Sequence, residues 1–234
     1  MPTVTAPSHD PLRHDPEVWL FDLDNTLYPA GCNLFAQIDV RIGAYISNLL
    51  KLPPAEARAI QKQYWKEHGT SMRGMMTLHG VDPREYLDYV HDIDYSPVPA
   101  SPHLEQSLAR LPGRKIIFTA GDVPHAERVM ERLGVAHHFE AIFDIVAGDY
   151  WPKPHKQIYE QLVKKHDVDP RRAAMVDDIA VNLRPAHELG MRTVWVRTEE
   201  SVKRAEGVPL DHIHHQTEDL ATWLADWLKQ RSVA

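Results

Sequence analysis

The sequence is poor in several residue types, and each scarcity excludes a class of protein. Its single cysteine, Cys32, excludes an internal disulfide framework and fits a reducing compartment, so we expect a cytoplasmic protein. No long run of Lys or Arg occurs and the formal net charge is −7, which argues against a nucleic-acid polymer as a partner. No apolar run approaches the length of a membrane span, so no membrane partner is expected either.

The N-terminal segment lacks the features of a folded or targeting element. Residues 1–16 contain four prolines and have neither the basic start nor the apolar middle of a signal peptide, so we expect a flexible leader. The whole chain of 234 residues is 43% hydrophobic. This is enough to bury a core in one domain, or in one domain that carries an insertion.

Short, continuously apolar segments predict five buried strands, at residues 18–23, 115–120, 141–148, 173–178 and 191–198. Runs that are apolar throughout, rather than alternating, are typical of a parallel sheet covered on both faces. Helical patterns separate the later segments, and the tail predicts a further short strand and a closing helix. The pattern predicts a doubly wound α/β fold.

The interval 31–110 interrupts this alternation. Its apolar residues recur at helical spacing in 33–50, 55–68 and 84–92, and no strand pattern appears among them. We therefore predict a core domain formed by residues 17–30 and 111–234. A block of helices, residues 31–110, is inserted after the first strand.

Reactive side chains stand where the predicted strands end, and in open α/β sheets ligands bind at that edge. They are Asp22, Asp24, Thr119, Asp177 and Asp178, with Lys153 after the third strand. Asp22 and Asp24 share one side of an extended chain, so a divalent cation neutralises them, one keeps its proton, or Asp24 belongs to an ordinary turn. Acids alone suggest a metal site, whereas an added lysine and a helix N-terminus suggest a bound phosphate. Phosphoryl transfer is the leading explanation.

The order of these motifs resembles that of a known family. "DLDNT" (22–26), "FTAGD" (118–122), "KP" (153–154) and "VDDIAVN" (176–182) are similar, in order, to the four motifs of the haloacid dehalogenase (HAD) superfamily of phosphohydrolases. The likeness extends over nearly the whole chain from about residue 17. It implies a Rossmann-like core with an inserted α-helical cap.

A closer resemblance concerns the substrate. Residues 64–92 and 118–135 look like the pyrimidine 5′-nucleotidase subgroup, which implies a nucleoside monophosphate such as UMP or CMP. Ala120 stands where this family usually has Asn, so backbone amides of Ala120 and Gly121 are expected to replace its side chain. Two alternatives remain: a phosphatase for a sugar phosphate or phosphoglycolate, and a non-catalytic protein that binds a phosphorylated ligand. The oligomeric state is not legible from the sequence.

The resemblance also implies a role for each motif residue. Asp22 is the nucleophile that becomes an aspartyl-phosphate, and Asp24 protonates the leaving alcohol and then activates water. The phosphate is held by Thr119, Ala120 and Lys153. Mg²⁺ is held by Asp22, the backbone carbonyl of Asp24, and Asp178, with Asp177 as an outer or alternate ligand. Dehalogenases of this superfamily lack an acid/base at the second Asp, which argues against their chemistry here.

For other polar residues, two interpretations remain. Asn182, one helical turn after Asp178, either steadies the metal-binding carboxylate or is an ordinary first-turn residue. Arg73 either reaches the substrate from the cap or is a solvated loop arginine. His125 and His155 follow motifs and either contact substrate or lie solvated at helix starts. The histidines within 212–215 are expected at the surface.

Overall fold

The computed structural model describes residues 15–231, so the predicted leader falls almost entirely outside the described residues. The strands are β1 (Val18–Phe21), β2 (Arg114–Phe118), β3 (Ala141–Phe143), β4 (Ala173–Asp177), β5 (Arg192–Val196) and β6 (His215–Thr217). The α-helices are α1 (Leu34–Leu50), α2 (Pro54–His68), α3 (Ser71–His79), α4 (Pro83–Val90), α5 (Pro102–Arg110), α6 (Val123–Leu133), α7 (Lys156–Lys165), α8 (Leu183–Glu188), α9 (Glu199–Arg204) and α10 (Leu220–Arg231). Short 3₁₀ helices are η1 (Ala30–Cys32), η2 (Ala136–His138), η3 (Pro170–Arg172) and η4 (Ala180–Asn182).

The strands form one six-stranded sheet in the order β3-β2-β1-β4-β5-β6, and every neighbouring pair is parallel. Strand β1 lies inside the sheet, where Val18 pairs with Arg114 of β2 and Ala173 of β4. Chain order runs outward from β1 in both directions, which is the doubly wound arrangement. The predicted α/β fold is confirmed.

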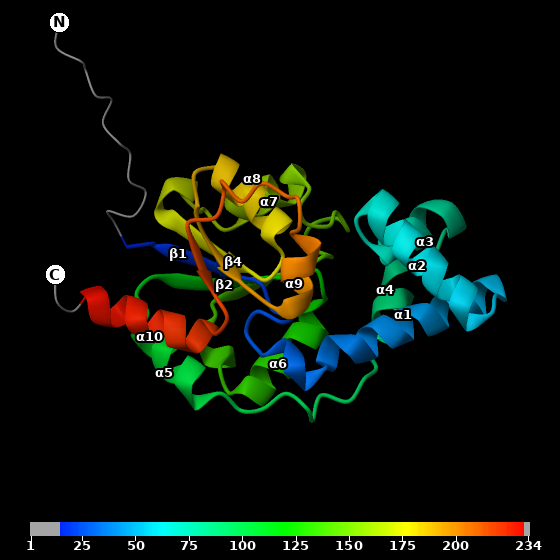
Figure 1. Cartoon of the computed structure of the whole chain (residues 1–234), viewed down its shortest axis with the longest axis horizontal. Helices are drawn as coiled ribbons and strands as arrows, with labels where there is room; N and C mark the ends of the chain where they lie inside the picture. The colour runs from blue at the N-terminus through cyan, green and yellow to red at the C-terminus, as the bar shows by residue number, and fades with distance from the viewer. Residues whose placement is uncertain (1–14, 232–234) are drawn as a thin grey trace, which may run out of the picture.

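Helices cover both faces of the sheet (Figure 1). Alternate residues of β1 point to opposite sides, because the side-chain period of a strand is two. Trp19 and Phe21 pack with residues of α5, α6 and α10, whereas Val18 and Leu20 pack with residues of α7 and α8. All four are at most 4% exposed, which explains why this strand is apolar throughout.

Helices α1–α4 form a separate body beside the sheet domain, on the right in Figure 1. They have their own apolar cluster, which includes Ile38, Ile46, Tyr64, Met75 and Tyr86. Helices α1 and α2 pack together, as do α2 and α3. The chain therefore leaves the sheet after β1, builds a small helical core, and returns.

Helix α5 differs from the rest of the predicted insertion. It packs against α10, and its Leu104 and Leu108 belong to the same apolar cluster as Trp19 of β1. The predicted range 31–110 included this helix because its pattern is helical, but pattern alone does not show which core a helix covers. By packing, α5 lies with the sheet domain. Among the described residues, no helix is long and apolar enough to cross a membrane.

Candidate active site

The centre of the site is the carboxyl edge of β1 and β4. Phe21 pairs with Val176, and the backbone N–H of Asp22 continues the ladder to the carbonyl oxygen of Val176 at 2.9 Å. Asp22 and Asp177 therefore leave neighbouring parallel strands side by side. Asp178 follows directly, and the indole N–H of Trp195 on β5 donates to its carbonyl oxygen at 2.8 Å.

Lys153 links the two strands. Its Nζ donates to Oδ1 of Asp22 at 2.7 Å, to Oδ2 of Asp177 at 2.6 Å and to the carbonyl oxygen of Phe118 at 3.0 Å. An ammonium group has three protons, so these partners use all its donors. The predicted site brings Lys153 to the acids, and in this structure its partners are protein oxygens.

Three carboxylates lie close together at this point. Oxygen atoms of Asp22, Asp177 and Asp178 lie within 4.8 Å of one another, and all three residues are buried. Burial raises the pKa of Asp22 to about 7, although Lys153 works in the opposite direction. Burial and then the charge of Asp22 raise the pKa of Asp178 well above its ordinary value. Burial and mutual repulsion therefore make both carboxyl groups keep their protons more readily than an exposed aspartate does.

This donor set fits a magnesium ion. Mg²⁺ favours hard oxygen ligands and commonly uses one or two carboxylates together with water. Asp22 and Asp178 supply two buried carboxylates whose pKa values are raised by burial and by neighbouring acids. Asp177 accepts hydrogen bonds from Lys153 and Asn182, as Asp22 does from Lys153 and Thr26, and its oxygen atoms belong to the same cluster.

Asp24 lies among a different set of groups. Its Oδ1 accepts a hydrogen bond from the Tyr28 hydroxyl at 2.6 Å and lies 2.9 Å from Nε2 of His125. Burial alone would raise the pKa of Asp24, but the charge and hydrogen bond of His125 outweigh it and lower that pKa. Burial would likewise lower the pKa of His125, and Asp24 raises it instead. The pair therefore holds one proton tightly between its members.

His125 is fixed by further contacts. Its Nδ1 lies 3.0 Å from the Tyr95 hydroxyl, and its ring stacks on His91 with centroids 4.4 Å apart. Nδ1 of His91 in turn lies 2.9 Å from Oδ1 of Asp122, the residue that caps helix α6. Tyr95 and His91 follow α4, so the chain that returns from the cap supports the acid/base candidate.

The second motif forms the turn between β2 and α6. Thr119 is buried, and its hydroxyl accepts a hydrogen bond from the N–H of Gly121 at 3.0 Å. Ala120 is exposed at this turn, and Asp122 caps the helix that follows. The amides of Gly121, Val123 and His125 donate to the side chains of Thr119, Asp144 and Asp122, so protein groups occupy this helix N-terminus, and the expected use of the Gly121 amide and of the helix N-terminus for a phosphate needs correction.

Arg73 connects the cap to the third motif. It lies in helix α3 rather than in a loop, and its guanidinium stacks 3.5 Å from the centroid of the Trp151 ring. Its Nη1 donates to the carbonyl oxygen of Tyr150 at 3.2 Å. The residue is therefore neither purely solvated nor bound to the acids, and it lies beside the segment that leads to Lys153.

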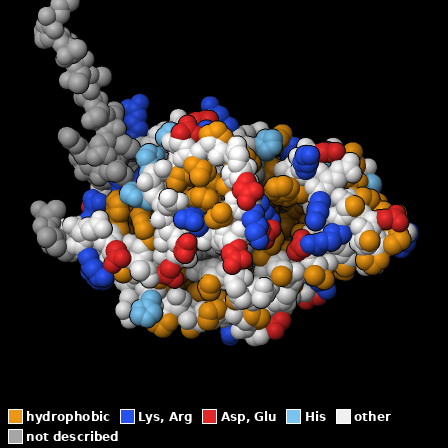
Figure 2. Space-filling model, viewed as in Figure 1, with side chains coloured by type: hydrophobic (Ala, Val, Ile, Leu, Met, Phe, Trp, Pro, Cys, Tyr) orange, Lys and Arg blue, Asp and Glu red, His pale blue; other side chains and the backbone are white. Residues whose placement is uncertain are grey.

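Figure 2 shows a recess between the sheet domain and the cap, bordered by basic and acidic side chains.

Three further expectations need correction. Asn182 donates to both carboxylate oxygens of Asp177, at 3.1 and 3.3 Å, and not to Asp178. His125 is fully buried and bound to Asp24, rather than solvated at a helix start. His212 is also fully buried, with Nε2 2.7 Å from the carbonyl oxygen of Ala180, although a surface position was expected.

Comparisons with known proteins agree on the superfamily. The model of the family "haloacid dehalogenase-like hydrolase" matches residues 17–190. The chain is 26% identical over 230 residues to phosphate metabolism protein 8 of Saccharomyces cerevisiae, which covers 90% of this chain and 70% of that protein.

Solved structures show the same fold. A HAD phosphatase from Thermococcus onnurineus is 17% identical with a TM-score of 0.60, covering 92% of this chain and 97% of that chain. A magnesium-bound HAD-hydrolase from Bacillus subtilis is 13% identical with a TM-score of 0.60, covering 92% and 100%. L-2-haloacid dehalogenase from Xanthobacter autotrophicus is 16% identical with a TM-score of 0.55, covering 94% and 100%. At these identities the likeness concerns the fold alone.

Proposed function

The chain belongs to the haloacid dehalogenase-like hydrolases, and from this premise we propose that it is a Mg²⁺-dependent phosphomonoester hydrolase acting through an aspartyl-phosphate. The observation that carries the proposal is the contrast between two acids that leave the same strand. Asp22 is buried beside Asp177, Asp178 and Lys153, and burial raises its pKa, whereas Asp24 shares a proton with His125. Bound Mg²⁺ would favour the ionised, nucleophilic form of Asp22, and the proton of the Asp24–His125 pair would be available to the leaving group.

In the first step, a carboxylate oxygen of Asp22 attacks phosphorus and the ester P–O bond breaks. The leaving oxygen takes a proton from the Asp24–His125 pair, which stops an unstable alkoxide from forming. In the second step, Asp24 accepts a proton from water as the water oxygen attacks phosphorus, and the bond to Asp22 breaks. The products are an alcohol and inorganic phosphate, and the enzyme is restored.

The remaining residues would orient the Asp22 carboxylate and bind the phosphate. Lys153 keeps the Asp22 carboxylate oriented, and substrate phosphate would compete for one of its three donors. Thr119 accepts a hydrogen bond from the Gly121 amide and so shapes the turn, where the Ala120 amide would bind the phosphate. When bound by Asp22, Asp178 and the Asp24 carbonyl, Mg²⁺ would supply positive charge that offsets repulsion between a carboxylate and a phosphate dianion.

The acid/base residue also favours phosphate chemistry over dehalogenation. An ester oxygen needs a proton to leave, whereas a halide does not, and Asp24 is held by Tyr28 and His125 in a position to supply one. The name of the yeast relative, phosphate metabolism protein 8, is in keeping with this choice. The likeness to dehalogenases concerns the fold.

For the substrate, we favour a pyrimidine nucleoside monophosphate, UMP or CMP, from the subgroup resemblance of residues 64–92 and 118–135. The stacked Arg73–Trp151 pair supports it, because it offers a cation and planar surfaces beside the Lys153 segment. A sugar phosphate or phosphoglycolate is the alternative within the same reaction. A non-catalytic phospholigand-binding protein is the alternative outside it. The single cysteine supports a cytoplasmic location.

The test is phosphate release from UMP, CMP, a purine monophosphate, glucose 6-phosphate and phosphoglycolate, with Mg²⁺ and with EDTA. Chloride release from 2-chloropropionate serves as the dehalogenase control. We expect Mg²⁺-dependent phosphate release, fastest with UMP and CMP, and none from Asp22→Asn. Preference for a sugar phosphate or phosphoglycolate would replace the substrate and keep the reaction. No release from any phosphoester would overturn the proposed activity.

A further inference from the structure

A second group of metal-ligating side chains lies away from the candidate active site. It consists of Glu105 on α5 and the adjacent residues His137 and His138 of η2, and we call it the His-His-Glu cluster. The 3₁₀ helix η2 precedes β3, so it lies toward the amino edge of the parallel sheet. The Asp22 site occupies the opposite, carboxyl edge. None of the reaction steps above uses this cluster.

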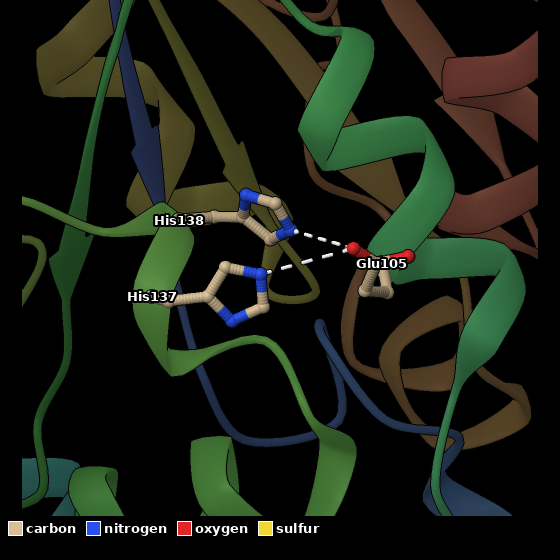
Figure 3. A group of neighbouring side chains, drawn as sticks. All are labelled: Glu105, His137 and His138. Carbon is tan, nitrogen blue, oxygen red and sulfur yellow. Dashed lines mark hydrogen bonds and ion pairs between the residues drawn. The ribbon is translucent and has the colours of Figure 1, made fainter.

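Both histidines point toward the same carboxylate oxygen of Glu105 (Figure 3). Nε2 of His138 lies 3.3 Å and Nε2 of His137 lies 3.7 Å from Oε1 of Glu105, and the potential ligand atoms of all three residues lie within 4.8 Å of one another. A tetrahedral Zn²⁺ with bonds of about 2.0–2.2 Å places its ligand atoms about 3.4 Å apart. The two histidine–glutamate separations lie on either side of this value.

From this geometry we propose that the His-His-Glu cluster is a binding site for a divalent transition metal ion of the Zn²⁺ type. Two imidazoles and one carboxylate form a donor set that suits Zn²⁺, with water completing the tetrahedron. Mg²⁺ is disfavoured, because it selects oxygen ligands. The cluster is thus chemically distinct from the all-carboxylate pocket of Asp22 and Asp178.

The setting of the ligands supports this assignment. The His138 side chain is 12% exposed, whereas that of His137 is 63% exposed, so one side of the cluster is held by the protein and the other admits an ion. The nearby Lys115 ammonium is turned to the carbonyl oxygens of Leu111 and Gly113.

A bound ion would join two segments that are distant in the chain. Glu105 belongs to the helix that returns from the cap to the sheet domain, and η2 connects α6 to β3. An ion that binds only when these segments are together stabilises the folded state. The site is therefore assigned a stabilising role, which is independent of the proposed hydrolase activity.

The test is Zn²⁺ binding by calorimetry to the metal-stripped full chain, without an affinity tag. An Asp178→Asn background removes a carboxylate from the other metal candidate. In this background we make three single substitutions in the cluster, His138→Asn, His137→Asn and Glu105→Gln. The control is His103→Asn, which changes an exposed histidine on the same helix as Glu105. We expect one Zn²⁺ equivalent and a Zn²⁺-dependent rise in Tm in the background protein and in the control.

Each cluster variant should weaken that binding by at least about tenfold, the loss that even an outer partner of a metal ligand causes. Because His137 and Glu105 are partly exposed, their variants keep the test valid if His138→Asn fails to fold. Equal Zn²⁺ binding in the cluster variants and the His103 control would overturn the proposal. So would the lack of any Zn²⁺ equivalent in the background protein.

Discussion

Asp22 and Asp24 follow the same strand and are two residues apart, yet they are surrounded by different charged and polar groups. Around Asp22 are Lys153, Asp177 and Asp178, and burial raises its pKa to about 7. Around Asp24 are hydroxyl and imidazole groups, and its pKa is lowered despite burial. In the first region burial outweighs the effect of Lys153 on the pKa, and the second region contains its own proton donor.

The difference shows how one short motif is divided between two tasks. The groups around Asp22 come from the sheet domain, from β4 and from the segment after β3. Those around Asp24 come in part from the chain that returns from the cap, through Tyr95 and His91. Substitutions in the two regions should therefore impair different steps of the reaction.

The largest effect is expected for Asp22→Asn. An amide oxygen is a poor nucleophile, so kcat for phosphate release should fall by at least about 10⁴-fold, as for loss of the nucleophile in other covalent enzymes. Circular dichroism and Tm check that the variant is folded. Activity within tenfold of wild type would show that Asp22 is not the nucleophile.

Asp24→Asn should lower kcat by about 10²–10⁴-fold, the usual range for a general acid–base. The loss should depend on the leaving group, because p-nitrophenolate leaves without a proton and a sugar alcohol does not. We therefore expect a burst of p-nitrophenol from p-nitrophenyl phosphate followed by slow turnover. An equal loss of the burst would place Asp24 in binding rather than in proton transfer.

His125→Asn should lower kcat by about tenfold to a hundredfold, a part of the acid–base contribution, because Asp24 loses the partner that orients it. KM should change little, since His125 does not lie in the phosphate-binding turn. His155→Asn is the matched control, an exposed histidine that follows the third motif. A rise in KM with unchanged kcat would contradict the positioning role.

The metal dependence of stability should change with pH. The ordinary pKa of 3.8 for Asp22 is raised to about 7 in the folded chain, so the stability that this group contributes is complete below about pH 4 and declines toward pH 7. Mg²⁺ binds the ionised form, so its stabilising effect should grow from pH 5.5 to pH 8. At a concentration about a hundredfold above Kd the gain is about 2.7 kcal/mol.

For a chain of this length the gain corresponds to a rise in Tm of about 5–10 °C at pH 8. Differential scanning calorimetry with Mg²⁺ or EDTA at both pH values measures it. Asp178→Asn is the control and should abolish the rise, since it removes a carboxylate of the cluster. A rise that is equal at both pH values would contradict the assignment of Asp22 as the proton-binding ligand.

The smallest effect is expected for Asn182→Ala, at about tenfold or less in kcat. Asn182 donates to Asp177, which in turn pairs with Lys153. Asn182 therefore acts through these two residues and not on the reacting atoms themselves. A steady-state comparison with Asp177→Asn, which removes the ion pair itself and should cost more, ranks the two. An Asn182→Ala loss as large as that of Asp177→Asn would show that the amide has a more direct task.

The sequence predicted the sheet and the residues at its carboxyl edge because both depend on local signals. Apolar runs mark buried strands, and motif residues such as Asp22 and Asp177 directly follow or end them. The parallel pairing of β1 and β4 then brings those residues together without further information.

Contacts that depend on helix register or on tertiary packing were not predictable in this way. His125 reaches Asp24 across 101 residues of chain, and nothing in the local pattern tells whether it points inward. The choice of Asn182 between Asp177 and Asp178 depends on the turn through η4. The place of α5 depends on its contact with α10, at the far end of the sequence.

The most direct test of the central claim asks whether the phosphoryl group passes through Asp22. Wild type and the Asp24→Asn variant are mixed with p-nitrophenyl phosphate, quenched in acid, digested and analysed by mass spectrometry for the peptide that contains Asp22. We predict a phosphorylated Asp22 that accumulates to a higher level in Asp24→Asn, because hydrolysis of the intermediate is slowed, and that is absent from Asp22→Asn. Phosphate release by wild type without any phosphorylated Asp22, together with an active Asp22→Asn variant, would contradict the account.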